Sequence, residues 1–291
     1  MKKQILASVL VLLLLIPFIN TTASADIGPK PSVVVEFKGL ENESYYVTLL
    51  SEQESTGPYS SRNEYQEYYG SREIWEKFKS YSDADGYYFL GYLSDCSDDD
   101  VFKWTYYPPS RFKILIYFPE YDRFVVSSES YERYAFDSYY TVDASKLDIN
   151  SVSPSGEGLR VRRSYDFKWE AISLLCRIVA TIAIELIVAV LFGLKVKRQI
   201  RVIALTNIAT QTLLNVLLNL INYKYGHAAF IFNFVWMELA VFVIEGFVYS
   251  RLLNRKDHFV SGGRAWGYAF TANLVSFGVG MVIAELLPGI F

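Results

Sequence analysis

Side chains with amide groups recur every fourth residue along one apolar segment, TNIATQTLLNVLLNLIN at residues 206–222. The members of this row are Asn207, Gln211, Asn215 and Asn219. A step of four residues drifts by about 40° around a helix, so the row lies along one side of it. An amide facing lipid would have no hydrogen-bond partner, so the row must face protein or water. It predicts either interhelical hydrogen bonds or the lining of a polar pathway or binding cavity.

Carboxylates occupy comparable positions in the neighbouring apolar segments. Glu185 and Glu238 fall near the middles of two segments, and Glu245 follows Glu238 by seven residues, on the same side of a helix. An unpaired charge at that depth is costly, so each carboxyl must be protonated, hydrated, bonded to an amide or bound to a cation. Ionisable residues inside a membrane are functional candidates by default. The intramembrane polar candidates are therefore Glu185, Asn207, Gln211, Asn215, Asn219, Glu238 and Glu245.

Four segments are apolar and long enough to cross a bilayer, each near the roughly 20 residues that a hydrocarbon core requires. They are residues 172–194, 202–222, 228–249 and 265–287. Together they predict a four-helix transmembrane bundle over residues 172–291.

Basic residues set the expected direction in which these segments are threaded. The connections at 195–201 and 250–264 each contain several Lys and Arg, so we expect both loops in the cytoplasm. Residues 26–170 and the C-terminus are then extracytoplasmic. Arg177 and Glu285 both fall near outer ends of the bundle, and we expect a structural ion pair between them.

The N-terminus has the features of a bacterial export signal. Lys2 and Lys3 precede the apolar stretch ILASVLVLLLLIPFI, and Ala23-Ser24-Ala25 fits the small-residue rule of signal peptidase. We therefore predict a cleaved signal peptide at residues 1–25, with an uncleaved anchor helix as the alternative. Cleavage requires the segment that follows to be exported, in agreement with the loop charges.

Residues 26–148 indicate an extracytoplasmic β-rich domain. The stretches SVVVEF, SYYVTLL and VFKWTYY alternate apolar and polar residues, and RFKILIYFP is typical of a central strand covered on both faces. One amphipathic helix, capped by Ser71, interrupts the strands. Short strands separated by Pro- and Ser-rich turns favour a sandwich-like fold. Residues 149–171 are predicted to be a linker and a basic juxtamembrane segment.

Two features of this domain are weak indications of binding. The stretch DCSDDD is a weak calcium candidate, although it lacks EF-hand spacing and also fits a solvated acidic turn. Its carboxylates are Asp95, Asp98, Asp99 and Asp100. Of the 23 tyrosines, 18 fall within residues 26–159. Exposed tyrosines suit recognition of an envelope glycan or a protein partner, while buried ones belong to the core.

Charge and missing motifs exclude several other functions. Residues 26–159 contain 12 Lys and Arg against 24 Asp and Glu, which leaves no basic surface for nucleic acid. The sequence has no GxxxxGK[ST] loop, and its two histidines, His227 and His258, are expected on opposite sides of the membrane. Nucleotide binding, histidine-based zinc chemistry and a Ser-His-Asp triad are therefore unsupported. We expect no cofactor, no metal and no enzymatic activity.

These observations predict a multi-pass plasma-membrane protein in contact with the lipid bilayer. In the first interpretation, its exported β domain binds an envelope glycan or protein partner, and its four-helix bundle anchors or couples that domain. In the alternative, it is a transporter or channel-like component that binds a proton or small cation at the intramembrane Glu, Asn and Gln residues. Energy coupling would then require additional membrane subunits.

Overall fold

A computed structural model describes residues 28–66, 71–149, 158–254 and 259–286, with side chains as far as Ile283. These residues fall into two compact units, one within residues 27–165 and the other beginning at Asp166. The first unit consists of strands with short helices, and the second of four long helices. The expected signal peptide lies outside the described residues.

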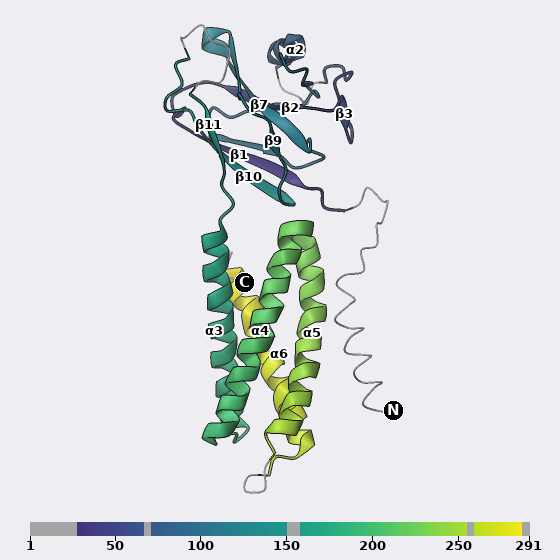
Figure 1. The fold of residues 1–291 in the computed structure, drawn as a ribbon, viewed down its shortest axis with the longest axis vertical. Coiled ribbons are helices and arrows are strands. Elements are labelled where there is room, and N and C mark those ends of the chain that lie inside the picture. The colour runs from purple at the N-terminus through teal and green to yellow at the C-terminus, as the bar shows by residue number, and fades with distance from the viewer. Residues whose placement is uncertain (1–27, 67–70, 150–157, 255–258, 287–291) are drawn as a thin grey trace. The chain divides into compact units, whose positions relative to one another are not determined.

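The first unit contains a mixed sheet with the strand order β11–β10–β1–β6 (Figure 1). Its strands are β1 (Ser32–Lys38), β6 (Val101–Trp104), β10 (Asp137–Asp143) and β11 (Arg160–Arg163). β1 runs parallel to β10, with Val35 opposite Tyr140, whereas the other two pairs are antiparallel. A parallel pair needs a long connection, and here the whole second sheet lies between β1 and β10 in the sequence.

The second sheet has the order β5–β2–β7–β8, and β9 also pairs with β7. Its strands are β2 (Tyr46–Ser51), β5 (Ser94–Asp95), β7 (Arg111–Phe118), β8 (Arg123–Val126) and β9 (Tyr131–Glu132). The smaller elements are β3 (Ser55–Thr56) paired with β4 (Tyr59–Ser60), helix α2 (Arg72–Ser80) and the 3₁₀ turn η3 (Pro119–Tyr121). The β-rich prediction for this region is confirmed.

Strand β7 is buried on both faces, as its continuous apolar sequence predicts. On one face, Ile114 and Ile116 share a hydrophobic cluster with Val35 of β1, so the two sheets enclose a common core. On the other face, Leu115 packs in a separate cluster with Trp75 of α2. Helix α2 therefore covers the outer side of the second sheet.

The predicted linker at residues 149–171 is wrong in part. Arg160–Arg163 form strand β11, which pairs antiparallel with β10, and Val161 packs against the hydrophobic core. Three of the four residues of RVRR are exposed, as is typical of an edge strand. Helix α3 also begins at Phe167, inside the expected linker, where Asp166 accepts a hydrogen bond from the backbone N–H of Trp169.

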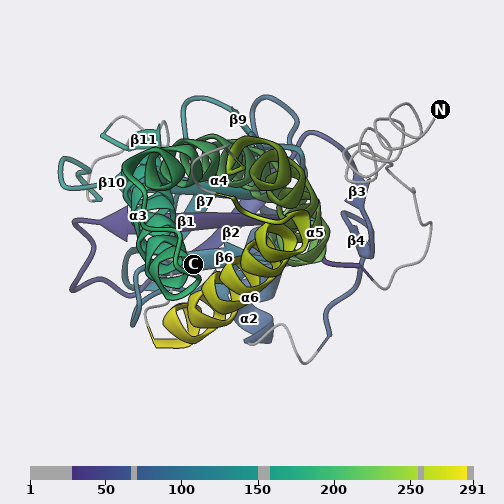
Figure 2. The same ribbon diagram turned by 90° about the horizontal axis from the view of Figure 1, so that it is seen from below.

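The second unit has four helices that are long and apolar enough to cross a membrane. They are α3 (Phe167–Leu191), α4 (Lys197–Tyr225), α5 (His227–Leu252) and α6 (Gly262–Leu286). Each helix packs against two others in the cyclic order α3, α4, α5, α6. The view along the helices shows that α6 runs obliquely across the other three (Figure 2).

Close packing of α5 on α6 depends on a glycine. A Cβ atom at Gly246 would overlap the ring of Trp266, so a residue without a side chain is required at this contact. Small residues of this kind allow membrane helices to approach closely. At the end of α3, the guanidinium of Arg264 donates to the backbone carbonyl of Phe192, which ties α6 to the C-terminus of α3.

The surface of the four-helix unit is apolar around its circumference. Large side chains with more than half of their surface exposed occur on all four helices, among them Ile187, Leu205, Phe232 and Phe270. A soluble monomer rarely exposes a continuous apolar patch of this extent. The interior carries the polar groups instead, and a hydrocarbon solvent favours this distribution.

Candidate functional site in the four-helix unit

The buried polar side chains come from matching faces of the helices. On α4, Asn207, Gln211 and Asn215 have at most 2% of their surface exposed, so the amide row faces the interior as predicted. The row fades at Asn219, which is only partly buried. A second row, unnoticed in the sequence, follows the inner face of α3 at the same four-residue spacing. It consists of Ser173, Arg177, Thr181 and Glu185.

Glu185 is the polar end of the α3 row and has no exposed surface. Its Oε2 accepts a hydrogen bond of 2.6 Å from Nδ2 of Asn207 on α4. Its backbone carbonyl accepts one from the hydroxyl of Tyr268 on α6. The same amide of Asn207 lies 3.0 Å from the Tyr249 hydroxyl on α5. Glu185 therefore lies where all four helices contribute polar groups.

Glu245 is the second carboxyl of the interior and is also fully buried. Its Oε1 lies 2.6 Å from the hydroxyl of Thr210, one turn beyond Asn207 on α4. Its Oε2 accepts a hydrogen bond of 2.8 Å from Nδ2 of Asn273 on α6. Amide and hydroxyl groups thus hold this carboxyl from two neighbouring helices.

The two carboxyls belong to one cluster, which we call the polar centre. It consists of Glu185, Asn207, Thr210, Glu245, Tyr249, Tyr268 and Asn273. Tyr249 follows Glu245 by one turn of α5, and its ring packs at 5.4 Å, centroid to centroid, on that of Tyr268. These contacts join the Glu185 and Glu245 sides of the cluster.

The polar centre has more acceptors than donors. Within the described residues, Glu185 Oε1, Asn207 Oδ1 and Asn273 Oδ1 are buried and have no hydrogen-bond partner. Neither Glu185 nor Glu245 forms an ion pair with a basic side chain in that part of the chain. A buried acceptor without a donor costs about 1–3 kcal/mol. Carboxyl and amide oxygens are groups that can hold a proton or a small cation.

The rest of the α4 row extends from the polar centre towards one end of the bundle. Asn215 donates to the backbone carbonyl of Gln211 at 2.8 Å, while Nε2 of Gln211 is buried without a partner. Asn219 accepts a hydrogen bond of 3.1 Å from the guanidinium of Arg177 on α3. The Asn215 amide also lies 3.4 Å from Oε1 of Gln211, so the amides form a column of polar groups along one side of α4.

The side chain of Glu285 lies outside the described part of the chain, and so does the expected ion pair of Arg177 with Glu285. The described partner of Arg177 is the amide oxygen of Asn219. The Nε of Arg177 is buried without a hydrogen-bond partner among the described atoms.

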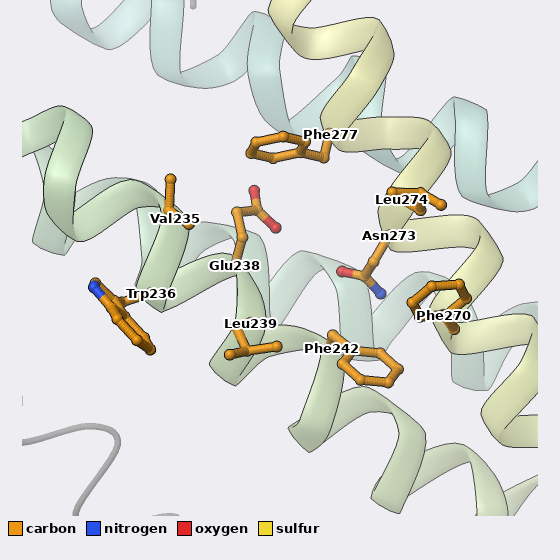
Figure 3. Close-up of a pocket in the computed structure, with 9 residues that line it drawn as sticks. All are labelled: Val235, Trp236, Glu238, Leu239, Phe242, Phe270, Asn273, Leu274 and Phe277. Carbon is orange, nitrogen blue, oxygen red and sulfur yellow. The ribbon is translucent and has the colours of Figure 1, made fainter.

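Glu238 does not belong to the polar centre, although its spacing from Glu245 predicts the same helix face. It is partly exposed and lines a cavity of about 400 Å³ between α5 and α6 (Figure 3). The seven-residue spacing does not account for the packing of α6, which leaves a cavity beside Glu238 but contacts Glu245 through Asn273. Asn273 lines the cavity as well as binding Glu245, so one amide borders both places.

The carboxylates of DCSDDD do not converge in the β-rich unit. Asp100 accepts from the Tyr45 hydroxyl at 2.7 Å, Asp95 from Ser97, and Asp99 from the backbone N–H of Val101. The described residues contain no group of three or more acidic, His or Cys side chains placed to hold a metal.

Sequence reasoning missed four members of the polar centre: Thr210, Tyr249, Tyr268 and Asn273. Asn273 carries the clearest signal, because it is an amide near the middle of an apolar span. Tyr249 lies one turn after Glu245, but a tyrosine near a helix end also fits an interfacial position.

Comparison with protein-family models, with curated proteins and with solved structures found no match to this chain.

Proposed function

We propose that the protein is a multi-pass plasma-membrane protein whose polar centre binds a proton or a small monovalent cation, as part of a transporter or channel-like component. The observation that carries this proposal is the combination of two fully buried carboxyls, Glu185 and Glu245, with buried oxygens that have no donor. The donor-poor cluster is a built site for a positively charged occupant.

The charge balance supports the proposal. Two carboxylates held in one low-dielectric cluster cannot both stay ionised without a compensating charge. No Lys, Arg or His of the described residues supplies it through an ion pair. A proton on one carboxyl or a cation between the oxygens supplies it directly. Carboxylate and amide oxygens are the ligands that hard cations prefer.

The polar column on α3 and α4 supports exchange of this occupant with one side of the membrane. Arg177 and Asn219 lie near one end of the bundle, Asn215 and Gln211 follow, and Glu185 lies at the inner end. One turn of a helix advances about 5–6 Å, so successive polar groups are close enough for bridging waters. Intramembrane polar residues of this kind mark ion and proton pathways.

We propose the threading given by the loop charges, with the β-rich unit outside the cell and residues 195–201 and 250–264 in the cytoplasm. A second candidate function, recognition of an envelope glycan or protein, is favoured by tyrosines on the surface of the β-rich unit. Tyr88 and Tyr139 expose 38% and 40% of their surfaces. Co-sedimentation of the purified protein with isolated cell-wall glycan tests this role, and Tyr88→Ser with Tyr139→Ser should abolish it.

Transport is tested with the full-length protein in liposomes that carry a pH-sensitive or sodium-sensitive dye. Wild type should dissipate an imposed gradient of one of these cations, and Glu185→Gln or Glu245→Gln should abolish the flux. Both substitutions keep the side-chain volume while removing the charge. Glu170→Gln, in the first turn of α3, is the matched control and should leave the flux unchanged.

Either of two results would contradict a role of the polar centre in transport. If the two Gln variants transport as wild type does, or if wild type shows no cation-dependent flux or binding, the polar centre is a packing device. Interhelical hydrogen bonds would then be its whole role.

A further inference from the structure

The cavity between α5 and α6 combines an aromatic wall with two oxygen acceptors. Trp236, Phe242, Phe270 and Phe277 supply rings, and Glu238 supplies a carboxylate (Figure 3). Its volume of about 400 Å³ falls within the range of small-molecule sites, roughly 300–1,000 Å³. Trp236 and Phe270 expose 39% and 54% of their surfaces, so the cavity opens to the outside of the bundle.

Both acceptors lack a donor from the protein. Glu238 has no hydrogen bond or ion pair within the described part of the chain. Asn273 is 6% exposed, and its Oδ1 is buried without a hydrogen-bond partner among the described atoms. Its Nδ2 donates to Glu245. Figure 3 shows the oxygen of Asn273 on the side that faces Glu238. A ligand that brings both positive charge and an N–H group would satisfy the carboxylate of Glu238.

From this geometry we propose that the cavity binds a protonated hydrophobic amine. Its ammonium group lies at the carboxylate of Glu238, and its apolar body lies against the aromatic wall. Aromatic faces attract a desolvated cation, so the rings favour the charged group as well as the body. This site is separate from the carboxyls of the polar centre.

Other occupants would contact fewer of the groups that line the cavity. A lipid acyl chain covers the rings but leaves the carboxyl of Glu238 without a hydrogen-bond donor. A lipid headgroup does not reach, because Glu238 lies near the midpoint of the 26-residue helix α5, about 17 Å from one end and about 21 Å from the other. A second copy of the chain brings an apolar helix face to this position, again without a donor.

The test is equilibrium binding of tritiated 2-(1-naphthyl)ethylamine to the full-length protein in nanodiscs. Neutral 1-propylnaphthalene, with nearly the same body and no charge, competes against it. We expect saturable binding of one amine per chain, at least tenfold tighter than the neutral compound. Glu238→Gln should weaken amine binding at least tenfold, and Glu238→Asp should restore most of it. Phe270→Leu should weaken it severalfold.

Glu245→Gln separates this proposal from the function of the polar centre, because a glutamine at this position still accepts a hydrogen bond from Asn273. It should leave amine binding within about threefold of wild type, while cation flux is lost. Conversely, Glu238→Gln should lose the amine and keep the flux. Each proposal can therefore fail while the other stands.

Three results would overturn the amine site. One is the absence of saturable amine binding to wild type. Another is equal affinity for the amine and the neutral compound, which would mark a groove filled by lipid. The third is oxidative crosslinking of Leu239→Cys between two copies, in a protein without its native cysteines, together with no amine binding. That result would assign the cavity to an interface.

Discussion

The two units of this protein treat buried charge in opposite ways. In the β-rich unit, Lys113 is 5% exposed, and its ammonium lies 3.0 Å from Asp83 and also contacts Asp85. In the four-helix unit, Glu185 and Glu245 are fully buried and have no counter-charge among the described residues. The first arrangement is complete within the protein. The second has no such counter-charge, and this difference separates a structural ion pair from a candidate site.

This contrast in buried charge predicts that the most destabilising substitution is in the β-rich unit. Lys113→Met should lower the free energy of unfolding by about 3–5 kcal/mol, because it leaves the buried carboxylate of Asp83 without its counter-charge. Urea unfolding of the full-length protein, followed by the fluorescence of buried Trp75 and Trp104, measures the change. The exposed Lys103→Met is the matched control. Equal unfolding midpoints for the two variants would show that the ion pair adds nothing.

The same ion pair should make the β-rich unit sensitive to alkaline pH. Burial by itself lowers the pKa of Lys113, but its hydrogen bonds to Asp85 and Asp83 and their charges raise that pKa above its ordinary value of 10.5. The stabilisation is therefore fully present below pH 10.5 and is lost as the pH rises through the raised pKa. Unfolding free energies of wild type and Lys113→Met should converge as the pH rises above 10.5 and through the raised pKa. A constant difference between them would contradict the assignment.

Helix packing should matter more to the stability of the four-helix unit than its carboxyls do. Gly246→Ala places a Cβ against the ring of Trp266 and should cost about 1–3 kcal/mol through overpacking. Thermal unfolding in detergent, followed by circular dichroism, measures this loss. Gly278→Ala, on α6, meets no atom within 4 Å and serves as the control. Similar melting temperatures for both variants would show that α5 and α6 do not pack as described.

The smallest stability effect is expected at the polar centre itself. Glu185→Gln and Glu245→Gln should change the free energy of unfolding by less than about 1 kcal/mol, or raise it, because each removes a buried ionisable group that no basic residue compensates. The same thermal measurement applies. A loss as large as that of Lys113→Met would mean that these carboxyls are structural, and the contrast between the units would disappear.

Much of this arrangement follows from the sequence by solvation alone. Asn207, Gln211 and Asn215 face inward because amides cannot remain in hydrocarbon, and their spacing fixes which side of α4 carries them. The strands of the β-rich unit follow from alternation in the same way, since Val33 and Val35 must share a face.

Residues brought together by tertiary packing could not be predicted. The pairing of Asn273 with Glu245 depends on how α6 crosses α5, and no local pattern encodes that crossing. The position of Glu238 outside the polar centre also depends on how α6 crosses α5. In the β-rich unit, the parallel pairing of β1 with β10 joins segments about 100 residues apart, and the edge strand β11 has too little apolar sequence to be recognised.

The central claim is that the carboxyls of Glu185 and Glu245 bind an exchangeable proton or cation. Infrared difference spectroscopy of the full-length protein in lipid tests it most directly, because it distinguishes a carboxylic acid from a carboxylate. Between about pH 5 and pH 9, or on addition of sodium, we predict interconversion of these two signals in wild type and its absence in the Glu185→Gln, Glu245→Gln double variant. Carboxyl signals in wild type that respond neither to pH nor to sodium would contradict the account.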